Sequence, residues 1–244
     1  SCALISGGSA KCWGNNAYGQ LGDGSSTTRP TAVSVSGVSG ISELAAGTGF
    51  TCARLSDGTA KCWGDPWSEG RLGDGTVDFS APVTVSGVSN AVEISNGFYH
   101  SCARISDGSV KCWGEIYKGD GTTNYVGATP VQIPGISGAV ELDAAWKSQC
   151  VRLSNGSIKC WGSGSNNRLG TGSTENLTVP LIVPSISGVS DVSLGNIGCA
   201  VISGTVKCWG NSQHYWLGDG NDKSSGKSLL PLSVSNVSNA TQIV

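Results

Sequence analysis

A pair of cysteines recurs five times along the chain, and each pair is followed at once by tryptophan and glycine. Cys52 to Gly64 reads Cys-Ala-Arg-Leu-Ser-Asp-Gly-Thr-Ala-Lys-Cys-Trp-Gly, and Cys102 to Gly114 nearly repeats it. The units that begin at Cys2, Cys150 and Cys199 are variants, and successive first cysteines are 50, 50, 48 and 49 residues apart. A period of this size is typical of propellers, solenoids and other repeat architectures.

Each unit contains several short candidate strands. A loop ending in Leu-Gly-Asp-Gly, such as Leu21 to Gly24, leads to a run such as Pro82 to Val85 and then to Val92–Ile94. Short β-branched runs between Gly and Pro indicate strands, and no segment has a sustained helical period. The 244 residues therefore predict an all-β, five-bladed β-propeller. We expect one domain, 1–244, with repeats starting near 2, 52, 102, 150 and 199.

The cysteine spacing predicts one disulfide within a hairpin of each blade. A three-residue turn, Ser56 to Gly58, pairs Leu55 with Thr59 and sets Cys52 opposite Cys62, where a bridge is feasible. In the fifth unit the loop is one residue shorter, yet a two-residue Ser203-Gly204 turn again opposes the cysteines. The predicted bridges are Cys2–Cys12, Cys52–Cys62, Cys102–Cys112, Cys150–Cys160 and Cys199–Cys208.

Two other uses of the cysteines compete with disulfides, namely reduced structural thiols and a metal site. Zinc sites usually contain Cys-x-x-Cys clusters or added histidines. The chain has no such cluster, and its two histidines, His100 and His214, fall in different parts of the repeat. We therefore expect disulfides, no metal and no cofactor. Disulfides predict an extracellular or cell-surface location.

The segment from Cys12 to Gly24 resembles the core of the regulator of chromosome condensation repeat. The preceding half of that pattern is matched by Gly97, His100 to Ala103 and Ser106 to Gly108. The resemblance covers all five units and implies a β-propeller with about one repeat per blade. The nuclear founder of the family exchanges nucleotide on a small GTPase and binds chromatin, whereas similar repeats also occur in secreted bacterial proteins. Five units with predicted disulfides and a slightly acidic chain argue against nucleotide exchange and chromatin binding for this protein.

The two ends of the chain resemble halves of one repeat. Thr241 to Val244 aligns with Val92 to Ser95, and Ser1-Cys2 aligns with Ser101-Cys102. Residues 241–244 would therefore begin a unit that residues 1–14 complete. This predicts a ring closed by pairing of the N- and C-terminal segments. The alternative is a polymer in which the tail of one subunit completes the next.

Several positions repeat in every blade and are expected to serve the scaffold. The tryptophans should form the core between blades: Trp13, Trp63, Trp113, Trp161 and Trp209. Two charged series also repeat, and they suggest one charged pair per blade or solvated strand ends, with an ion site on the propeller axis as the alternative. The basic series is Lys11, Lys61, Lys111, Lys159 and Lys207. The acidic series is Glu43, Glu93, Glu141 and Asp191, with Gln242 in the fifth position.

Two further sets of polar residues lie at turns. The Gly-Asp-Gly turns favour a turn role over calcium binding and contain Asp23, Asp74, Asp120 and Asp219. Four asparagines begin glycosylation sequons and are possible modification sites: Asn155, Asn176, Asn236 and Asn239.

Aromatic residues that do not repeat mark the candidate binding surface, because binding sites on repeated scaffolds come from loops that differ. They lie before the first cysteine or after Trp-Gly, and the alternative is that they only cap the blades. The predicted partner-binding residues are Trp67, Phe98, Tyr99, Trp146, Tyr215 and Trp216.

Composition excludes several functions. Charged residues are 13% of the chain, the net charge is −2 and no Lys/Arg run occurs, which argues against nucleic-acid binding. No apolar stretch approaches the roughly 20 residues that span a bilayer. No catalytic constellation appears, so we expect no enzyme and a structural role for His100.

The remaining function is a non-catalytic extracellular protein-interaction or structural module, such as a repeating subunit of a cell-surface assembly or filament. Its partner would be another protein or a second copy. The alternatives are a secreted proteinaceous enzyme inhibitor and a glycan-binding lectin.

Overall fold

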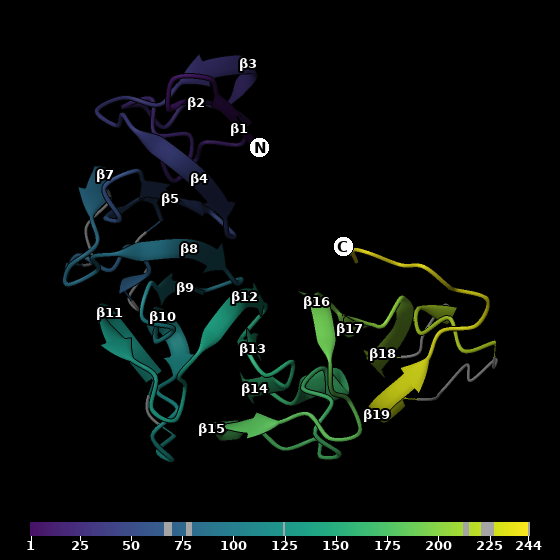
Figure 1. Cartoon of the computed structure of the whole chain (residues 1–244). Helices are drawn as coiled ribbons and strands as arrows, with labels where there is room; N and C mark the ends of the chain where they lie inside the picture. Colours follow the sequence, from purple (N-terminus) through teal and green to yellow (C-terminus); the bar gives the residue numbers. More distant parts are fainter. Residues whose placement is uncertain (66–69, 77–79, 124, 212–214, 221–226, 244) are drawn as a thin grey trace. The chain divides into compact units, whose positions relative to one another are not determined.

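The chain folds into five antiparallel sheets, here named blades A to E (Figure 1). The structure is a computed structural model that describes residues 1–65, 70–76, 80–123, 125–211, 215–220 and 227–243. The predictions on Trp67 and His214 therefore lie outside the described residues. The described residues contain no helix long and apolar enough to cross a membrane. The predicted all-β propeller blades are confirmed.

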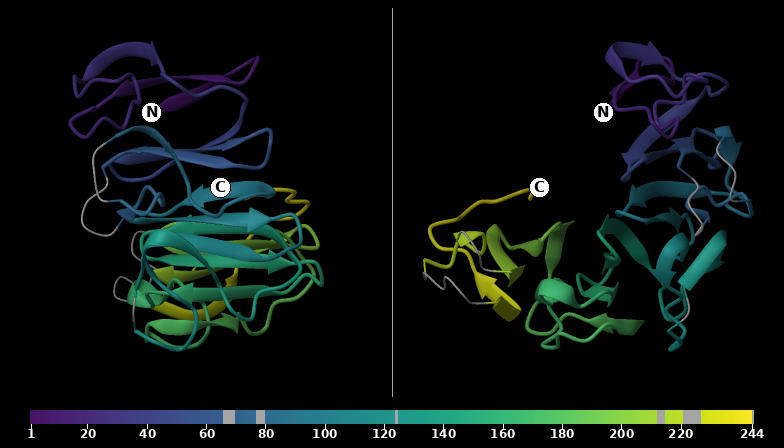
Figure 2. Two further views of the ribbon diagram at one scale, coloured as in Figure 1. Left: turned by 90° about the vertical axis from the view of Figure 1, so that its left-hand side faces the viewer. Right: turned by 180° about the vertical axis from the view of Figure 1, so that it is seen from behind.

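Every blade is a meander whose strands pair in chain order, as the views of Figures 1 and 2 let the reader follow. Blade A has three strands and blades B to E have four each. The strands of A and B are β1 Cys2–Ile5, β2 Ser9–Gly14 and β3 Arg29–Ser34, then β4 Ile41–Ala46, β5 Phe50–Leu55, β6 Ala60–Gly64 and β7 Ser80–Thr84. Those of C are β8 Ala91–Asn96, β9 His100–Ile105, β10 Val110–Tyr117 and β11 Tyr125–Gln132.

Blades D and E follow the same order. Blade D contains β12 Ala139–Ala145, β13 Ser148–Leu153, β14 Ile158–Gly162 and β15 Leu177–Ile182. A short 3-10 turn, η1 Ser165–Asn167, follows β14. Blade E contains β16 Val189–Leu194, β17 Ile197–Ile202, β18 Thr205–Asn211 and β19 Lys227–Ser233.

The cysteine register is confirmed in all five hairpins, and the described residues contain no free cysteine. In blade B, Cys52 lies opposite Cys62, and Leu55 N donates to Thr59 O at 2.8 Å. Gly58 has a φ of +79°, which closes the three-residue turn in a conformation that glycine adopts without strain. Because the two cysteines of each pair are direct cross-strand neighbours, their Cα atoms are only 4.0–4.1 Å apart.

The shorter fifth hairpin preserves this register as the sequence predicts. Ile202 pairs with Thr205, and Cys199 again lies opposite Cys208. Ser203 and Gly204 have φ values of +50° and +79°, which is the geometry of a primed two-residue turn. The loss of one loop residue is therefore absorbed by a change of turn type, and the bridge keeps its place.

The chain divides into two compact units. Unit 1 comprises Ser1–Ile116 with Asn124–Ile133, and unit 2 comprises Tyr117–Thr123 with Pro134–Val244. In unit 1, Trp63 joins Ala10 and Ile41 in one apolar cluster, and Trp113 joins Phe50 and Leu72 in another. Apolar residues of neighbouring blades thus form a shared core within the unit.

The tail of the chain lies where the sequence alignment predicts the first strand of a repeat. Ile243 N donates to Asp191 Oδ2 at 2.7 Å, as Ile94 N of β8 donates to Glu43 Oε2 at 3.1 Å. The tail therefore makes the contact that a first strand makes with the preceding blade. Closure of the ring through this segment stays a prediction.

Candidate functional site

Each blade presents two kinds of connection at its opposite ends. Because antiparallel strands reverse direction at every turn, the first-to-second and third-to-fourth connections leave from one end of the sheet. We call that end the loop face and the opposite end the hairpin face. The hairpin face carries the disulfide hairpins and the connections between blades. The two faces differ in how much their sequences can vary.

The hairpin face is locked by backbone hydrogen bonds between successive blades. Gly8 O accepts from Ile41 N at 2.9 Å, and Gly58 O accepts from Ala91 N at 2.9 Å. A Cβ on Gly58 would lie 2.9 Å from the Asn90 Cα, so the turn and the connection leave no room for a larger residue. The hairpin face therefore consists of residues that repeat in sequence, whereas the residues that differ between repeats lie at the loop face.

Three of the repeated tryptophans hydrogen-bond to the loop of the preceding repeat. Trp63, Trp113, Trp161 and Trp209 are fully buried, which confirms the prediction of a core role for these four. The indole Nε1 of Trp63 donates to Gln20 O at 3.0 Å, that of Trp113 to Arg71 O at 3.0 Å and that of Trp209 to Arg168 O at 2.8 Å. Trp13 differs, because 38% of its surface is exposed.

The Leu-Gly motif receives these indole rings, a role that sequence reasoning missed. Leu21, Leu72 and Leu169 are buried, and the glycine after each leaves space for the next tryptophan. A Cβ on Gly22 would lie 2.8 Å from Trp63 Nε1, and one on Gly170 would lie 2.6 Å from Trp209 Cδ1. The signal was present in the sequence as one Leu-Gly per Trp. In the third unit, where only Gly119-Asp120-Gly121 remains, the pattern is incomplete.

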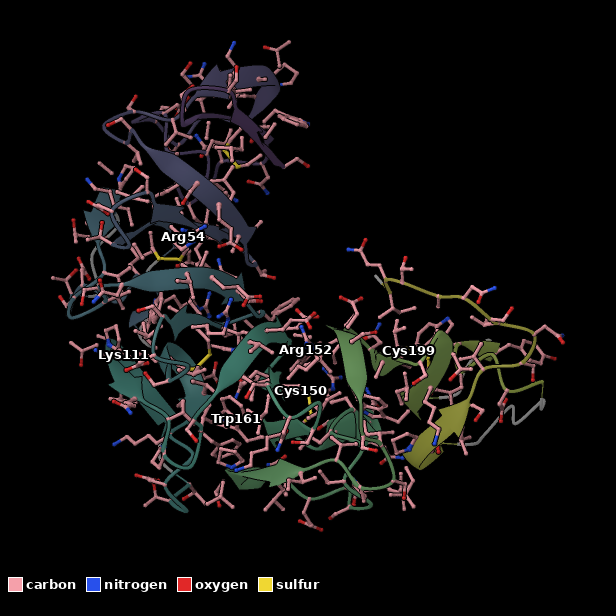
Figure 3. The ribbon with its side chains drawn as sticks, viewed as in Figure 1. Arg54, Lys111, Cys150, Arg152, Trp161 and Cys199 are labelled. Atoms are coloured by element: carbon pink, nitrogen blue, oxygen red, sulfur yellow. A yellow bond between two sulfur atoms is a disulfide. The ribbon has the colours of Figure 1, made fainter. Side chains whose placement is uncertain are left out.

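The repeated acidic residues pair with arginine, not with the repeated lysines. Glu43 accepts from Arg54 Nε at 3.0 Å, and the equivalent pairs are Glu93–Arg104 and Glu141–Arg152. Figure 3 labels Arg54 and Arg152 on their blades and shows a yellow disulfide bond beside Cys150. Blades B, C and D therefore each contain a charged pair, but its basic partner is arginine and not the lysine of the predicted series. In blade E, Asp191 lies opposite Val201, so this cross-strand ion pair is absent there.

The carboxylates also accept hydrogen bonds from the backbone of the following blade. Glu141 accepts from Val192 N at 3.3 Å. Burial raises the pKa of the Glu141 carboxyl above its ordinary value and Asp191 adds to the rise, while Arg152 and the Val192 amide oppose it. The repeated lysines instead donate to turn carbonyls, as Lys111 does to Gly87 O at 2.7 Å. Among the described residues no group of three His, Cys, Asp or Glu could hold a metal ion.

The aspartates of the Gly-Asp-Gly turns bond their own turns. Asp120 accepts from the Thr122 backbone and hydroxyl, which lowers the pKa of its carboxyl. Burial alone would raise the pKa of Asp23, but hydrogen bonds from Ser25, Arg29 and Asn16 lower it. Asp23 Oδ2 is 2.8 Å from Arg29. The described members of this series therefore perform turn chemistry.

His100 and the sequon asparagines occupy structural positions. The buried His100 ring packs against Gly97, where a Cβ would lie 2.2 Å from the ring, just as Phe50 packs against Gly47 in blade B. Asn155 Oδ1 caps its own turn, and Asn176 Nδ2 donates to Tyr117 Oη at 2.9 Å. Asn236 and Asn239 both adopt φ near +59°, which asparagine tolerates. All four asparagines are exposed, and their glycosylation stays a prediction.

The unrepeated aromatic residues lie on the loop faces of both units. In unit 1, Phe98 and Tyr99 form an edge-to-face pair with centroids 4.8 Å apart, and the Arg71 guanidinium lies 4.4 Å over the Tyr99 ring. In unit 2, Trp146, Tyr215 and Trp216 are 45%, 65% and 41% exposed. Trp146 and Tyr215 have φ values of +45° and +60°, conformations that are unfavourable for bulky residues. The structure thus places all the described candidates on loops, and their use in binding stays a prediction.

A cavity of about 650 Å³ opens beside the loop between β2 and β3 of blade A. Its lining includes Tyr18, Ser25, Ser26, Thr27 and Ala81, and none of the described residues that line it is charged. The loop is held from within, because Asn16 Nδ2 donates to Ser25 O at 2.9 Å and Asn16 Oδ1 accepts from Leu21 N at 2.9 Å. Sequence reasoning did not single out this hollow, since its residues recur as ordinary turn formers.

Comparison with known proteins agrees with this architecture. Residues 8–54 and 155–202 match the family model of the Regulator of chromosome condensation (RCC1) repeat, and residues 41–68 match a second model of that repeat. The first two segments start 147 residues apart, three periods of 49, as expected if the model follows the blade repeat. No curated protein matches the chain by sequence.

Solved propellers share the fold at low sequence identity. Yeast RCC1 (Prp20) bound to Kap60 is 18% identical with a TM-score of 0.82, and the match covers 96% of this chain and 59% of that one. Human WBSCR16 is 20% identical with a TM-score of 0.81, covering 96% and 64%. The ectodomain of the Physcomitrella patens receptor kinase CR4 is 21% identical with a TM-score of 0.52, covering 86% and 47%. The chain therefore spans about three fifths of the length of the first solved proteins it matches.

Proposed function

Because the chain is built from regulator of chromosome condensation repeats, we propose that it is a non-catalytic, extracellular module that binds other proteins through its loop face. The observation that carries this proposal is the contrast between the two faces. The hairpin face repeats and makes backbone hydrogen bonds between successive blades within each unit, whereas the loop face varies and exposes Trp146, Tyr215 and Trp216. Exposed aromatic side chains on variable loops are the usual anchors of protein interfaces.

Related folds support protein partners. The yeast relative was solved bound to Kap60, and a second structure of Prp20p from Saccharomyces cerevisiae, 18% identical with a TM-score of 0.81, was described with its binding to Gsp1p and histones. At this identity the likeness concerns the fold alone, so we take from it only that such propellers serve as protein-binding scaffolds.

Five hairpin disulfides support an extracellular location. Disulfides persist in oxidising compartments and are rare where thiols are kept reduced. The same fold occurs in the ectodomain of a plant receptor kinase. Within this class, the finer proposal is a repeating subunit of a cell-surface assembly or filament, with a second copy as the partner.

Capture by the purified chain tests the binding proposal. The loop-face variant carries Trp146→Ala, Tyr215→Ala and Trp216→Ala. The matched control carries Leu181→Ala, Ile182→Ala and Leu229→Ala, which removes exposed apolar side chains from the outer strands of the same unit. Each protein is immobilised and exposed to the extracellular fraction of its source. We expect a partner to be retained by wild type and control and lost by the loop variant. Equal retention by both variants would reject the loop face.

Sedimentation equilibrium separates the filament subunit from a module with a foreign partner. A repeating subunit associates with itself as concentration rises, and the loop-face variant should then stay monomeric while the control associates. A strict monomer at the highest attainable concentration argues against the assembly and leaves the foreign partner in place.

A second candidate, a neutral-glycan lectin, is favoured by the cavity at Tyr18. An uncharged hollow that offers hydroxyl groups beside an aromatic ring on a pre-organised loop suits a neutral sugar. A glycan array probed with wild type, Tyr18→Ala and Tyr18→Phe tests this candidate. We expect the alanine variant to lose binding and the phenylalanine variant to retain most of it. Absence of any neutral-glycan signal with wild type rejects the lectin.

A further inference from the structure

Unit 2 contains a buried arginine that has no counter-ion among the residues that the structure describes. Arg168 follows η1 and is only 2% exposed. Its Nε donates to Ser165 O at 2.9 Å, while its buried Nη1 has no hydrogen-bond partner among the described residues. No described carboxylate pairs with it; Glu175, on the same loop, is exposed and makes no ion pair in the described part of the chain. Within the described part of the chain, no acidic group therefore balances the charge of this guanidinium.

Blade B contains the matching arginine, Arg71, beside a carboxylate, although the buried Nε of Arg71 also has no hydrogen bond among the described residues. Arg71 and Arg168 both precede the Leu-Gly motif and both present a backbone carbonyl to the next tryptophan. Arg71 Nη1 lies 3.5 Å from Asp65 Oδ2, and each side chain is only 6% exposed. Asp65 directly follows Cys-Trp-Gly, and the residue in that place in blade D is Ser163. Compared with blade B, blade D therefore has the same arginine but a serine in place of the aspartate.

An unpaired buried charge lowers the folding stability of the isolated chain. Burial lowers the pKa of the Arg168 guanidinium, and no acidic neighbour offsets the effect. An arginine nevertheless stays protonated in proteins, so it cannot escape the cost by losing its proton. A buried charge is normally paired, and an unpaired one points to a missing anion or water. The nearest loop does not supply that anion, since it carries Lys147, whose carbonyl accepts from Ser163 N at 2.8 Å.

Trp146 covers the guanidinium. The Arg168 Cζ lies 5.6 Å from the centroid of the Trp146 ring, and that ring is 45% exposed at the surface. The positive φ of Trp146 is unfavourable for an aromatic residue, so the cover is held in a strained backbone. A movement of this one side chain would open the arginine to a ligand.

We propose that Arg168 and Trp146 form a recognition site for a single carboxylate, the side chain of an aspartate or glutamate on a partner protein. A guanidinium binds a carboxylate through two parallel hydrogen bonds, and one positive charge balances one negative charge. A phosphate group carries nearly two charges at neutral pH, so one guanidinium alone would not balance it. The indole of Trp146 would pack against the methylene groups of the acidic side chain.

This proposal deepens the protein-binding function and rests on it, but it can be tested without the partner. The chain has six arginines, so an arginine Nε–Hε NMR spectrum is simple to assign. The probe is N-acetyl-glutamate α-amide, with N-acetyl-glutamine α-amide as the uncharged control and inorganic phosphate as the third arm. We expect the glutamate derivative alone to shift the Arg168 signal.

Substitution of Ser163 provides the decisive variant. Ser163→Asp supplies the internal carboxylate that blade B has, and we expect it to abolish the response, while Ser163→Asn, of similar volume, retains it. If the aspartate variant fails to fold, Arg168→Lys serves as the second variant. It keeps the positive charge but lacks the two parallel N–H donors of the guanidinium, so its affinity for the probe should fall about tenfold. No shift with wild type, an equal shift with the glutamine derivative, or an unchanged response in Ser163→Asp would each overturn the proposal. A stronger response to phosphate would overturn the carboxylate assignment.

The capture experiment keeps the two proposals distinguishable. If Ser163→Asp captures the partner as well as wild type does, the carboxylate site fails while the loop-face function stands. If wild type responds to the glutamate derivative but captures nothing, the site stands without the proposed function.

Discussion

In blade B, the indole of Trp63 and the hydroxyl of Thr51 both donate to Gln20 O at 3.0 Å, and Arg71 has Asp65 beside it. In blade D, the equivalent residues are Trp161, Gln149 and Arg168, and each has a buried polar atom without a partner among the described residues. The two blades share the disulfide, the tryptophan and the Glu–Arg pair. They differ at the strand residue before the first cysteine and in the loops around the tryptophan and the arginine.

This difference separates what the repeat provides from what the loops provide. Strands, bridges and buried rings come from repeated positions and are the same in both blades. Satisfaction of buried polar groups depends on unrepeated residues, namely Asp65 and the complete Leu-Gly loop before Trp63. Because natural proteins satisfy nearly all such groups, an external partner could supply the hydrogen bonds that these atoms of blade D lack.

The largest effect is expected from exchanging the acidic residue. Asp65→Ser leaves Arg71 buried without its carboxylate, and we expect a loss of about 3 kcal/mol of unfolding free energy because breaking a buried pair strands a charge. Ser163→Asp should instead stabilise the chain. Chemical denaturation of both variants measures the change. A loss below about 1 kcal/mol for Asp65→Ser would place the pair among ordinary surface pairs and remove the contrast.

The disulfides should not distinguish the blades. Replacing Cys52 and Cys62 by alanine, or Cys150 and Cys160, opens loops with the same sequence separation of 10 residues. A chain-entropy model gives a loss of about 2.5–3 kcal/mol for either pair. Thermal unfolding of the two double variants compares them directly. A gap of more than about 1 kcal/mol would mean that the scaffold itself differs between the blades.

Tryptophan-to-phenylalanine substitutions isolate the indole hydrogen bond. Trp63→Phe removes a donor that is bonded, whereas Trp161→Phe removes one that has no partner in the described residues. The volume change is the same, so we expect Trp63→Phe to cost about 1–2 kcal/mol more. Equal losses of unfolding free energy would show that the Trp161 donor is satisfied.

The smallest effect concerns acid. The folded pKa of Asp23 lies below its usual value of 3.8, so its contribution is present above that pH and is lost as pH falls through the lowered value. Thr171 holds the same place in blade D and cannot titrate. Asp23→Asn should cost at most about 1 kcal/mol near neutral pH, with the difference from wild type vanishing in strong acid. Thr171→Val should show no such pH dependence in the same melts.

The repeated part of the fold could be predicted from the sequence because each signal is local. The turn at Gly58 fixes the register of Cys52 and Cys62, and the shorter turn at Gly204 does the same in blade E. The burial of four tryptophans followed from their recurrence. The arginine partners of Glu43, Glu93 and Glu141 were not foreseen, because cross-strand neighbours depend on the bulge that opens each first strand.

The candidate site was only partly predictable. Trp146 stood out as an unrepeated aromatic residue, but Arg168 looked like an ordinary loop residue. Its burial and its lack of a carboxylate follow from tertiary packing around η1 and from a comparison with Arg71 that needs both positions in space. The change from Asp65 to Ser163 was visible in the sequence, yet nothing local gave it meaning.

The most direct test transfers the site from one blade to the other. In the double variant Asp65→Ser with Ser163→Asp, the residue after Cys-Trp-Gly is exchanged and every repeated position is unchanged. The arginine Nε–Hε spectrum is then titrated with N-acetyl-glutamate α-amide. If the repeated residues build the scaffold and the serine after Cys-Trp-Gly creates the carboxylate site, the probe no longer shifts the Arg168 signal and instead shifts the Arg71 signal. A response that stays at Arg168, or one that fails to appear at Arg71 in the folded variant, would contradict it.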